Sequence, residues 1–358
     1  MSLRVLVAMS GGVDSSVAAL LLSAQGHDVV GATMKLWGES VDSGCCSVAD
    51  VEDARRVAQQ LGVPHHVFNF TAEFERAVVG SYVTAHEEGY TPNPCIACNQ
   101  HLKFGSFLRR ACLLGFDAMA TGHHARISRR EPGTGQRLRR GRDLAKDQSY
   151  VLYMLGPDEL AHLLLPVGEL TKDEVRALAA EAGLRTAAKP DSQDVCFISR
   201  SAGREGFLRS RISVGPGRFV DSAGRDMGAT DALELLTVGQ RRGLGLAAPL
   251  TRPCRQYVTH VDFTSRTASV GPLAELLVNS VEVVSLRWPC GPLPPGSRVE
   301  AQFSAHGRPV RCRWEGSRKA GVIHLDEPAR RVAPGQAVVL YKPAAEGGDV
   351  VVGGGTAA

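Results

Sequence analysis

The octapeptide Met9–Ser16, Met-Ser-Gly-Gly-Val-Asp-Ser-Ser, constrains the fold of this 358-residue chain more than any other segment. It follows the apolar run Leu3–Ala8 and precedes the apolar stretch Val17–Leu22, a pattern that predicts a strand, a glycine-rich loop and a helix. The unpaired N–H groups and dipole at the start of such a helix favour an anion. No lysine precedes the hydroxyl residues, so this is not a Walker A loop. The sequence predicts a phosphate-binding turn; a turn that only caps the helix through Ser10 or Asp14 is the alternative.

Short apolar runs alternate with helical periodicity up to about residue 185, which is typical of a parallel sheet covered on both faces. The expected strands are Leu3–Ala8, Val29–Lys35, His66–Phe70 and Ala118–Thr121. The expected helices are Val48–Leu61, Phe74–His86, Leu102–Leu114 and Lys172–Ala182. This half therefore predicts a doubly wound α/β domain.

After Gly206 the pattern changes, because glycine and proline become frequent and long helical periods disappear. Short β-branched runs such as Ser280–Leu286 and Ala337–Tyr341 predict strands. We expect a catalytic domain over residues 1–200, a small β-rich domain over 205–272 and a further β-rich domain over 277–358. Residues 353–358, which are mostly glycine and alanine, are expected to fray after the final strand.

The composition favours a protein of a reducing compartment. Nine cysteines, an odd number without a short-range framework, argue against a disulfide scaffold. The sequence has no apolar segment of membrane-spanning length and no signal-peptide cleavage pattern, so we expect a cytoplasmic protein without a membrane partner. The net charge of +4 permits a nucleic-acid partner but does not require one.

Two prolines fix an extended approach to a pair of thiols in the segment Thr91–Asn99, Thr-Pro-Asn-Pro-Cys-Ile-Ala-Cys-Asn. A helix that starts near Asn99 would place Cys98 at its N-terminal end, where the pKa of a thiol falls and the nucleophilic thiolate is favoured. A zinc half-site and a pair of buried apolar cysteines are the other interpretations. Zinc requires a second pair of ligands, and Cys45 and Cys46 are adjacent rather than spaced, so we expect no metal site.

The polar stretch Asp191–Ile198 contains one further cysteine, Cys196, between apolar residues. Together with the two segments above, this stretch resembles the tRNA-specific 2-thiouridylases, which are N-type ATP pyrophosphatases. The resemblance continues, in family order along nearly the whole chain, through Ala120–His124, Lys146–Tyr150, Pro166–Gly168, Val238–Gly245 and Pro334–Ala337. It implies an adenine-nucleotide α-hydrolase-like domain followed by two small β-rich domains, the last of them barrel-like.

The resemblance implies ATP-dependent 2-thiolation of the wobble uridine, position 34, in the tRNAs for lysine, glutamate and glutamine. Adenylation of the C2 oxygen and persulfide sulfur transfer would yield 2-thiouridine, AMP and pyrophosphate. The implied participants are ATP with Mg²⁺, the anticodon stem-loop of tRNA, and a cysteine desulfurase or a sulfur-relay protein that donates the persulfide sulfur.

The resemblance also implies roles for individual residues. Cys98 matches the nucleophile, and Cys196 matches the cysteine that carries the persulfide and forms a transient disulfide with Cys98. The residues implied to bind ATP are Ala8, Met9, Ser10, Gly11, Gly12, Val13, Asp14, Ser15, Met34 and Gly122. The residues implied to contact the target base or the rest of the tRNA are Asn93, Pro94, Cys95, His123, Lys146, Asp147, Gln148 and Gln336.

The chain departs from the family pattern at two places. Some relatives carry an aspartate, proposed as a base, at the position of Cys95. The Arg-Tyr pair with which members often contact tRNA is absent from the matching segment, which here includes Ser304 and Ala305.

Seven arginines around Pro132–Gly135 predict a hairpin with a basic rim. The rim either binds a phosphate backbone or is only a solvated face. The arginines are Arg126, Arg129, Arg130, Arg137, Arg139, Arg140 and Arg142. Two rival functions stay open on the sequence. One is another adenylating ligase built on the same loop, such as an argininosuccinate or amidotransferase-type synthetase; the other is a zinc-dependent RNA-binding protein without catalysis.

Overall fold

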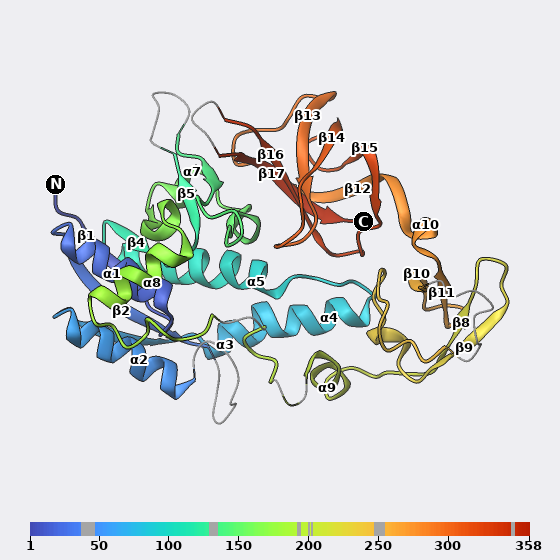
Figure 1. Cartoon of the computed structure of the whole chain (residues 1–358), viewed down its shortest axis with the longest axis horizontal. Coiled ribbons are helices and arrows are strands. Elements are labelled where there is room, and N and C mark those ends of the chain that lie inside the picture. The colour runs from blue at the N-terminus through green and yellow to red at the C-terminus, as the bar shows by residue number, and fades with distance from the viewer. Residues whose placement is uncertain are drawn as a thin grey trace.

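The computed structural model describes residues 1–36, 47–128, 135–191, 195–199, 201, 203–246, 255–344 and 348–358. In this part of the chain the strands form a five-stranded, a four-stranded and an eight-stranded sheet. Figure 1 shows the five-stranded sheet at the N-terminal end, the four-stranded sheet at the opposite end and the largest sheet above them. Among the described residues, no helix has the length and apolar character needed to cross a membrane.

The five-stranded sheet is parallel, with the order β3-β2-β1-β4-β7. Leu6 of β1 packs into one apolar cluster, while its neighbours Val5 and Val7 pack into another, and all three are fully buried. Both faces are therefore covered, which confirms the doubly wound α/β class. The strands are β1 (Arg4–Ala8), β2 (Asp28–Lys35), β3 (His65–Asn69), β4 (Ala118–Ala120) and β7 (Leu163–Leu164). The helices on the Val5 face are α1 (Val13–Ala24), α2 (Val48–Gln60) and α8 (Lys172–Glu181).

Two long helical runs cover the opposite face, and each contains a π-helical stretch. The first consists of α3 (Thr71–Phe74), the π-helix Glu75–Gly80 and α4 (Ser81–Glu87). The second consists of α5 (Pro94–Ala97), the π-helix Cys98–Phe107 and α6 (Leu108–Leu113). Apolar side chains from both runs fill the cluster that contains Leu6. Because π-helical turns are frequent at functional sites, the position of Cys98 at the start of the second one is notable.

The C-terminal strands close a six-stranded barrel, because β12 pairs with β15 on one side and with β17 on the other. Trp314 and Ile323 are fully buried in its core. This barrel confirms the barrel-like character expected of the C-terminal part. Its strands are β12 (Leu277–Arg287), β13 (Ser297–Gln302), β14 (Val310–Gly316), β15 (Gly321–Arg330), β16 (Ala337–Lys342) and β17 (Val350–Ala357).

The expectation that the glycine-rich end frays is wrong, because Gly353–Gly355 lie inside β17 and are buried. A Cβ on Gly353 would collide with the Trp288 ring, and one on Gly355 would collide with the carbonyl oxygen of Val284. The glycines therefore allow β17 to approach β12 closely enough to close the barrel. Their lack of side chains is a packing requirement here.

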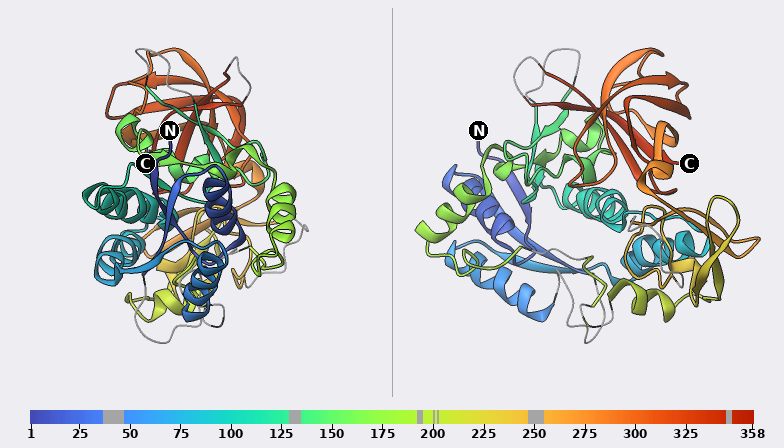
Figure 2. Two further views of the ribbon diagram at one scale, coloured as in Figure 1. Left: turned by 90° about the vertical axis from the view of Figure 1, so that its left-hand side faces the viewer. Right: turned by 45° about the vertical axis from the view of Figure 1, so that its right-hand side comes forward.

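A hairpin from the N-terminal half joins the barrel sheet. Strands β5 (Ala125–Ile127) and β6 (Leu138–Arg140) pair with each other, and Arg139 pairs with Val350 of β17. In both views of Figure 2 this hairpin extends from the N-terminal part toward the barrel. The link is relevant to the site because the segment that follows β6 contains several of the expected tRNA-contacting residues.

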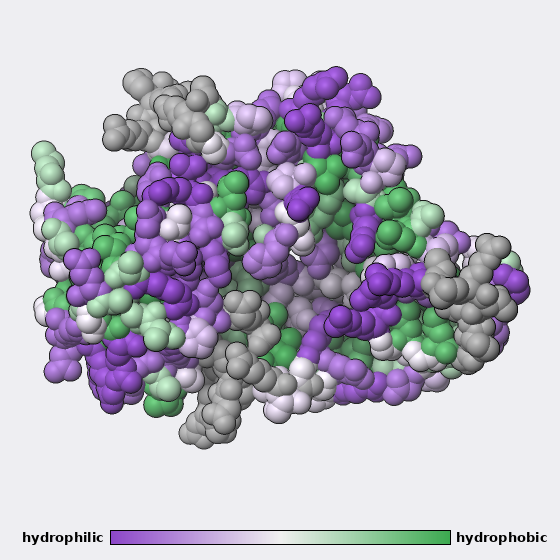
Figure 3. Space-filling model, in the orientation of Figure 1, coloured by the Kyte–Doolittle hydropathy of each residue, from purple (hydrophilic) through white to green (hydrophobic). Residues whose placement is uncertain are grey.

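The four-stranded sheet has the order β10-β11-β8-β9 and a small core around Phe219 and Val258. Its strands are β8 (Gly217–Val220), β9 (Asp226–Thr230), β10 (Tyr257–Asp262) and β11 (Thr267–Gly271). The remaining helices are short: α7 (Pro157–Leu160), α9 (Gly203–Arg209), α10 (Leu273–Leu276) and the 3-10 turns Ser149–Leu152, Pro166–Glu169 and Leu233–Leu235. Figure 3 shows a hollow on this face of the molecule, bounded by the N-terminal part, the barrel and the small sheet.

Candidate active site

The segment Ala8–Ser15, called here the phosphate loop, connects β1 to the start of α1. Gly11 has a φ of 74°, and a Cβ there would collide with the carbonyl oxygen of Asp50, so the loop requires glycine at this position. Gly12 is the N-cap and supplies no capping side chain. The Asp14 carboxylate forms hydrogen bonds with His124 and Lys172. These contacts argue against the alternative in which Asp14 serves only to cap the helix.

The expected ATP-binding residues gather at the carboxyl ends of three adjacent strands. Because β1 lies between β2 and β4, Met34 of β2 and Gly122 after β4 flank the phosphate loop. A Cβ on Gly122 would collide with the backbone of Asp14 and Ser15, so these two segments are in close contact. The edge beyond the carboxyl ends of the strands is where open α/β sheets bind their ligands.

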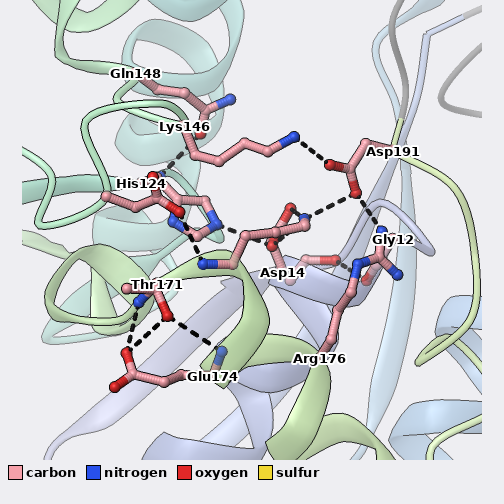
Figure 4. A network of polar contacts seen from close by, with 12 residues as sticks. Gly12, Asp14, His124, Lys146, Gln148, Thr171, Glu174, Arg176 and Asp191 are labelled. Atoms are coloured by element: carbon pink, nitrogen blue, oxygen red, sulfur yellow. Dashed lines mark hydrogen bonds and ion pairs between the residues drawn. The ribbon is translucent and has the colours of Figure 1, made fainter.

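A network of charges lies against the phosphate loop (Figure 4). Lys172, the first residue of α8, donates to both carboxylate oxygens of Asp14 at 2.7 Å and lies 2.9 Å from Asp191. Asp191 also accepts from Lys146 at 2.8 Å and from Arg176 at 2.7 Å. Burial alone would raise the pKa of Asp191, but the hydrogen bonds from Lys146 and Lys172 outweigh it and lower that pKa to about 2. The same balance, with His124 and Lys172 as donors, lowers the pKa of Asp14.

A second lysine fixes the other side of the loop. Lys189 donates to the carbonyl oxygen of Gly11 at 2.9 Å and pairs with Asp50 and Asp53 at 2.7 and 2.8 Å. Burial would lower the pKa of Lys189, but these two carboxylates outweigh it and raise the pKa. No local sequence pattern marks Lys172 or Lys189, because a lysine at a helix start or in a polar loop resembles any solvated residue.

The expected start of the helix near Asn99 is wrong, since α5 begins at Pro94. Asn93 caps it by accepting from the backbone N–H of Cys95 at 3.0 Å, and proline suits the first helical position because it has no N–H to leave unpaired. Cys98 therefore lies one turn into the helical run, beyond the first turn where the helix dipole acts. The argument that a helix terminus lowers the pKa of Cys98 loses its basis.

The two expected catalytic cysteines contact the same apolar cluster. Cys98 is buried within the cluster that covers the second face of the N-terminal sheet, and half-buried Cys196 packs against that cluster. Next to Cys196, the ring of Phe197 packs against Phe74 and Tyr82 at centroid distances of 5.7 and 5.5 Å. The fold thus places two thiols that are 98 positions apart in the sequence against one apolar cluster.

His86, at the end of α4, gives this aromatic cluster a pH dependence that unfolding experiments can detect. Its ring is buried against Tyr82, and burial lowers the pKa of His86 to about 4. Between pH 6.5 and 4 the unfolded chain therefore binds the proton first, and the free energy of unfolding falls as the pH falls. In urea unfolding we expect the free energy of unfolding of His86→Leu, relative to that of wild type, to increase by up to about 3 kcal/mol as the pH is lowered from 7 to 4. A stability difference that stays constant across this range would contradict the assignment.

The expected tRNA-contacting residues differ in exposure. Cys95 is exposed, Lys146 is partly exposed, and Gln336 donates to the carbonyl oxygen of Thr91, just before Asn93, at 2.8 Å. His123 is buried and pairs with Thr121, and burial with nearby Lys103 places the pKa of His123 well below its ordinary value. A neutral His123 offers hydrogen bonds or ring contacts rather than charge.

Asp147 is buried, and its carboxylate is occupied by the protein itself. It accepts from the backbone N–H groups of Gly141 and Ser149 at 2.9 and 3.1 Å, and from Arg140 Nη1 at 2.9 Å. Gln148 accepts from the backbone N–H of His124 at 2.9 Å. These contacts fix the backbone of the Lys146–Gln148 strip, in which Lys146 is the partly exposed cation.

The expectation of a basic rim, or of a solvated face, is wrong for Arg139 and Arg140, which are both buried. Arg140 bonds to Asp349 and Gln302 as well as to Asp147, and its guanidinium lies 3.5 Å from the ring centroid of Tyr341. Arg140 therefore attaches the β5–β6 hairpin to the barrel. Arg129 and Arg130 lie outside the described residues.

Within the ranges that the structure describes, no group of three or more His, Cys, Asp or Glu side chains is placed to hold a metal ion. Cys45 and Cys46, which the zinc interpretation would have needed, lie outside those ranges.

Comparison with known proteins gives a match along the whole chain. Residues 3–200 match the family described as tRNA methyl transferase HUP domain, and residues 278–357 match the aminomethyltransferase beta-barrel domain. The chain is 42% identical to the tRNA-specific 2-thiouridylase MnmA of Corynebacterium aurimucosum, with 99% of both chains covered. It is 44% identical to the protein of the same name from Roseiflexus sp., with 98% of both covered. It is also 44% identical to that of Thermobifida fusca, with 100% of this chain and 96% of the other covered.

Proposed function

The chain belongs to the family of tRNA-specific 2-thiouridylases, a family of sulfurtransferases, and from that premise we propose how its own residues carry out the reaction. Family membership decides against both rival functions, the adenylating synthetase and the non-catalytic zinc protein. The substrate we propose is the wobble uridine, position 34, of the tRNAs for lysine, glutamate and glutamine. The observation that carries the proposal is the phosphate loop, with Gly11 in the left-handed region and Asp14 held by Lys172.

Adenylation is the first step. The C2 oxygen of uridine is a poor leaving group, so it attacks the α-phosphorus of ATP, and the bond to the β-phosphate oxygen breaks. Pyrophosphate leaves, and AMP is now attached to the former carbonyl oxygen. The backbone N–H groups around Gly11 and Gly12, together with the Mg²⁺ of the ATP complex, stabilise the charge of the leaving group. Met34 and Gly122 border the nucleotide in this assignment.

Sulfur transfer is the second step. A donor protein, a cysteine desulfurase or a sulfur-relay protein, first places a sulfane sulfur on Cys196. That sulfur reaches C2 directly or as released hydrosulfide, and the C2 oxygen departs with AMP. The Cys98 thiolate attacks the Sγ of Cys196 and breaks the persulfide bond, so both routes end in a Cys98–Cys196 disulfide. An external thiol then reduces it. The shared apolar cluster of the two cysteines supports this pairing.

The proposed tRNA-contacting residues come from four segments of the chain. We assign the target base to Asn93, Pro94 and Cys95, and the rest of the anticodon stem-loop to His123, Gln336 and the Lys146–Gln148 strip. In this assignment Asp147 acts by holding the strip, because its carboxylate is already occupied. The Cys98–Cys196 disulfide formed in each turnover must be reduced again, so we place the reaction in the reducing cytoplasm. We also propose the domain limits 1–200, 205–272 and 277–358.

An anaerobic reaction tests the proposal. The protein is incubated with unmodified tRNA for glutamate, Mg-ATP, cysteine and a cysteine desulfurase, and the nucleosides are analysed by mass spectrometry. We expect 2-thiouridine at position 34 and one AMP for each thiolated tRNA. Formation of AMP and pyrophosphate without any thionucleoside would support adenylation at the phosphate loop but would contradict the proposed acceptor or the proposed sulfur donor.

A further inference from the structure

The chain between α4 and α5, residues 88–93, is held from two sides by the C-terminal β-rich parts. Gly89 has a φ of 81°, and a Cβ there would collide with the ring of Phe263, in the connection between β10 and β11. Thr91 contacts residues 333–336, called here the barrel turn, which lead into β16. Figure 1 shows the chain between α4 and α5 below the barrel. This chain leads directly into the residues that we assign to the target base, so its position matters for the reaction.

The barrel turn satisfies both backbone polar groups of Thr91. The N–H of Thr91 donates to the carbonyl oxygen of Pro334 at 2.8 Å, and Nε2 of Gln336 donates to the carbonyl oxygen of Thr91 at 2.8 Å. Between these two bonds lies Gly335, whose φ is 86°. A Cβ on Gly335 would lie 2.8 Å from the Cβ of Tyr90 and 2.9 Å from the backbone nitrogen of Thr91. Glycine therefore allows the turn to approach Thr91 closely.

The barrel turn is itself fixed to the end of β17. The N–H of Gly335 donates to the carbonyl oxygen of Ala357 at 3.0 Å, and the N–H of Ala357 donates to the carbonyl oxygen of Gln336 at 2.8 Å. Within the turn, the N–H of Gln336 donates to the carbonyl oxygen of Ala333 at 3.1 Å. Because Ala357 is the last residue of β17, the closed barrel determines where the turn, and with it Thr91, lies.

Two prolines transmit the position of Thr91 to the start of α5. Pro92 and Pro94 flank Asn93, and a proline ring fixes φ at about −65°. Few backbone torsions are therefore free between Thr91 and the helix. The side chain of Asn93 accepts from the N–H of Cys95. A displacement of Thr91 would consequently move the residues assigned to the target base together with the helix start.

We propose that the barrel turn is a positioning element of the active site, which holds Thr91 so that the target base meets ATP in reactive geometry. Gly335 and Gln336 are its positioning residues, and Gln336 acts through Thr91 in addition to the contact with tRNA assigned above. A small displacement of a bound reactant lowers the rate strongly, because the reacting atoms must approach closely and in the right orientation. The inference rests on the proposed assignment of residues 93–95 to the target base.

Two variants of the barrel turn and one control test this role. Gly335→Ala adds a Cβ that collides with Thr91, and Gln336→Met removes the donor to Thr91 while it keeps the length of the side chain. Gly291→Ala is the matched control, because Gly291 has a φ of 85° in the connection between β12 and β13. No atom of the described residues lies within 4 Å of the Cβ that this change adds. The control therefore introduces the same backbone strain without a displacement of Thr91.

The first measurement is amide hydrogen exchange, followed by mass spectrometry of peptides that contain Thr91. Wild type is expected to protect the Thr91 amide, because it is bonded to Pro334. In Gly335→Ala and Gln336→Met we expect exchange to become several-fold faster, and in Gly291→Ala we expect it to match wild type. Unchanged exchange in both barrel-turn variants would overturn the proposal. The measurement uses the protein alone, so its outcome is independent of the proposed function.

The second measurement is the rate of 2-thiouridine formation in a single turnover at saturating tRNA, together with the Kd for tRNA. In both barrel-turn variants we expect the rate to fall about tenfold. The Kd is expected to stay nearly unchanged, because phosphate contacts elsewhere dominate the affinity for a nucleic acid. A weaker affinity with an unchanged rate would confine Gln336 to a direct tRNA contact and overturn the proposal. Absence of thiouridine in wild type would count against the proposed function instead, and hydrogen exchange would still decide whether the barrel turn holds Thr91.

Discussion

The Cys196→Ser variant is expected to lose 2-thiouridine formation by about 10³-fold or more, because a hydroxyl group cannot carry a sulfane sulfur. Serine is close to cysteine in size, and Cys196 lies at the edge of its apolar cluster, so we expect the fold to persist. The test is a single turnover with protein that has been loaded with sulfur beforehand, followed by nucleoside mass spectrometry. Cys112→Ser, which changes an exposed cysteine on α6, is the control and is expected to react like wild type.

The companion variant Cys98→Ser separates the two routes of sulfur transfer. If the terminal sulfur attacks C2 directly, the tRNA stays attached to Cys196 through a disulfide that Cys98 would normally break. If hydrosulfide is the attacking species, the persulfide stays on Cys196 and the tRNA is unchanged. Intact mass spectrometry of the protein distinguishes these products. Full thiolation activity in both the Cys98→Ser and Cys196→Ser variants would rule out the mechanism.

Periodicity predicts the central strands of the N-terminal sheet well because β1, β2 and β4 are buried and read as continuous apolar runs. The strand expected at Val29–Lys35 is β2 (Asp28–Lys35), and the helix expected at Lys172–Ala182 is α8 (Lys172–Glu181). The expected helix start near Cys98 is wrong because prolines favour an extended approach, whereas an asparagine cap before a proline is also a helix start. Local patterns that fit two structures require tertiary contacts to decide between them.

Long-range contacts account for the other differences. Gly353–Gly355 look featureless in sequence, and only the approach of Trp288 and Val284 shows why glycine is needed there. The candidate site has the same limitation. The motifs indicated the phosphate loop and the two cysteines, but Lys172 contacts Asp14 across 158 positions of sequence, and no local pattern marks it.

Arg140 is expected to contribute more to stability than its sequence neighbour Arg142. The Arg140 side chain is 7% exposed and bonds to two carboxylates, whereas that of Arg142 is 51% exposed and pairs with Glu174 at the surface. Arg140→Met leaves the buried Asp147 without its cation, which costs about 3 kcal/mol. Arg142→Met loses only a solvent-exposed pair, so we expect a much smaller cost. Urea unfolding, followed by far-ultraviolet circular dichroism, measures both shifts.

The same pair of variants tests whether Arg140 aligns the Lys146–Gln148 strip, which we propose to contact tRNA, with the barrel. Arg140 Nη1 connects Asp147 of the Lys146–Gln148 strip with Gln302 of β13, and Gln302 donates to the carbonyl oxygens of Ser304 and Ala305. Without this link the strip and the barrel are free to shift relative to each other. We therefore expect Arg140→Met to weaken tRNA binding about tenfold while the KM for ATP is unchanged, and Arg142→Met to leave both unchanged. Equal tRNA affinities for the two variants would confine Arg140 to a role in stability.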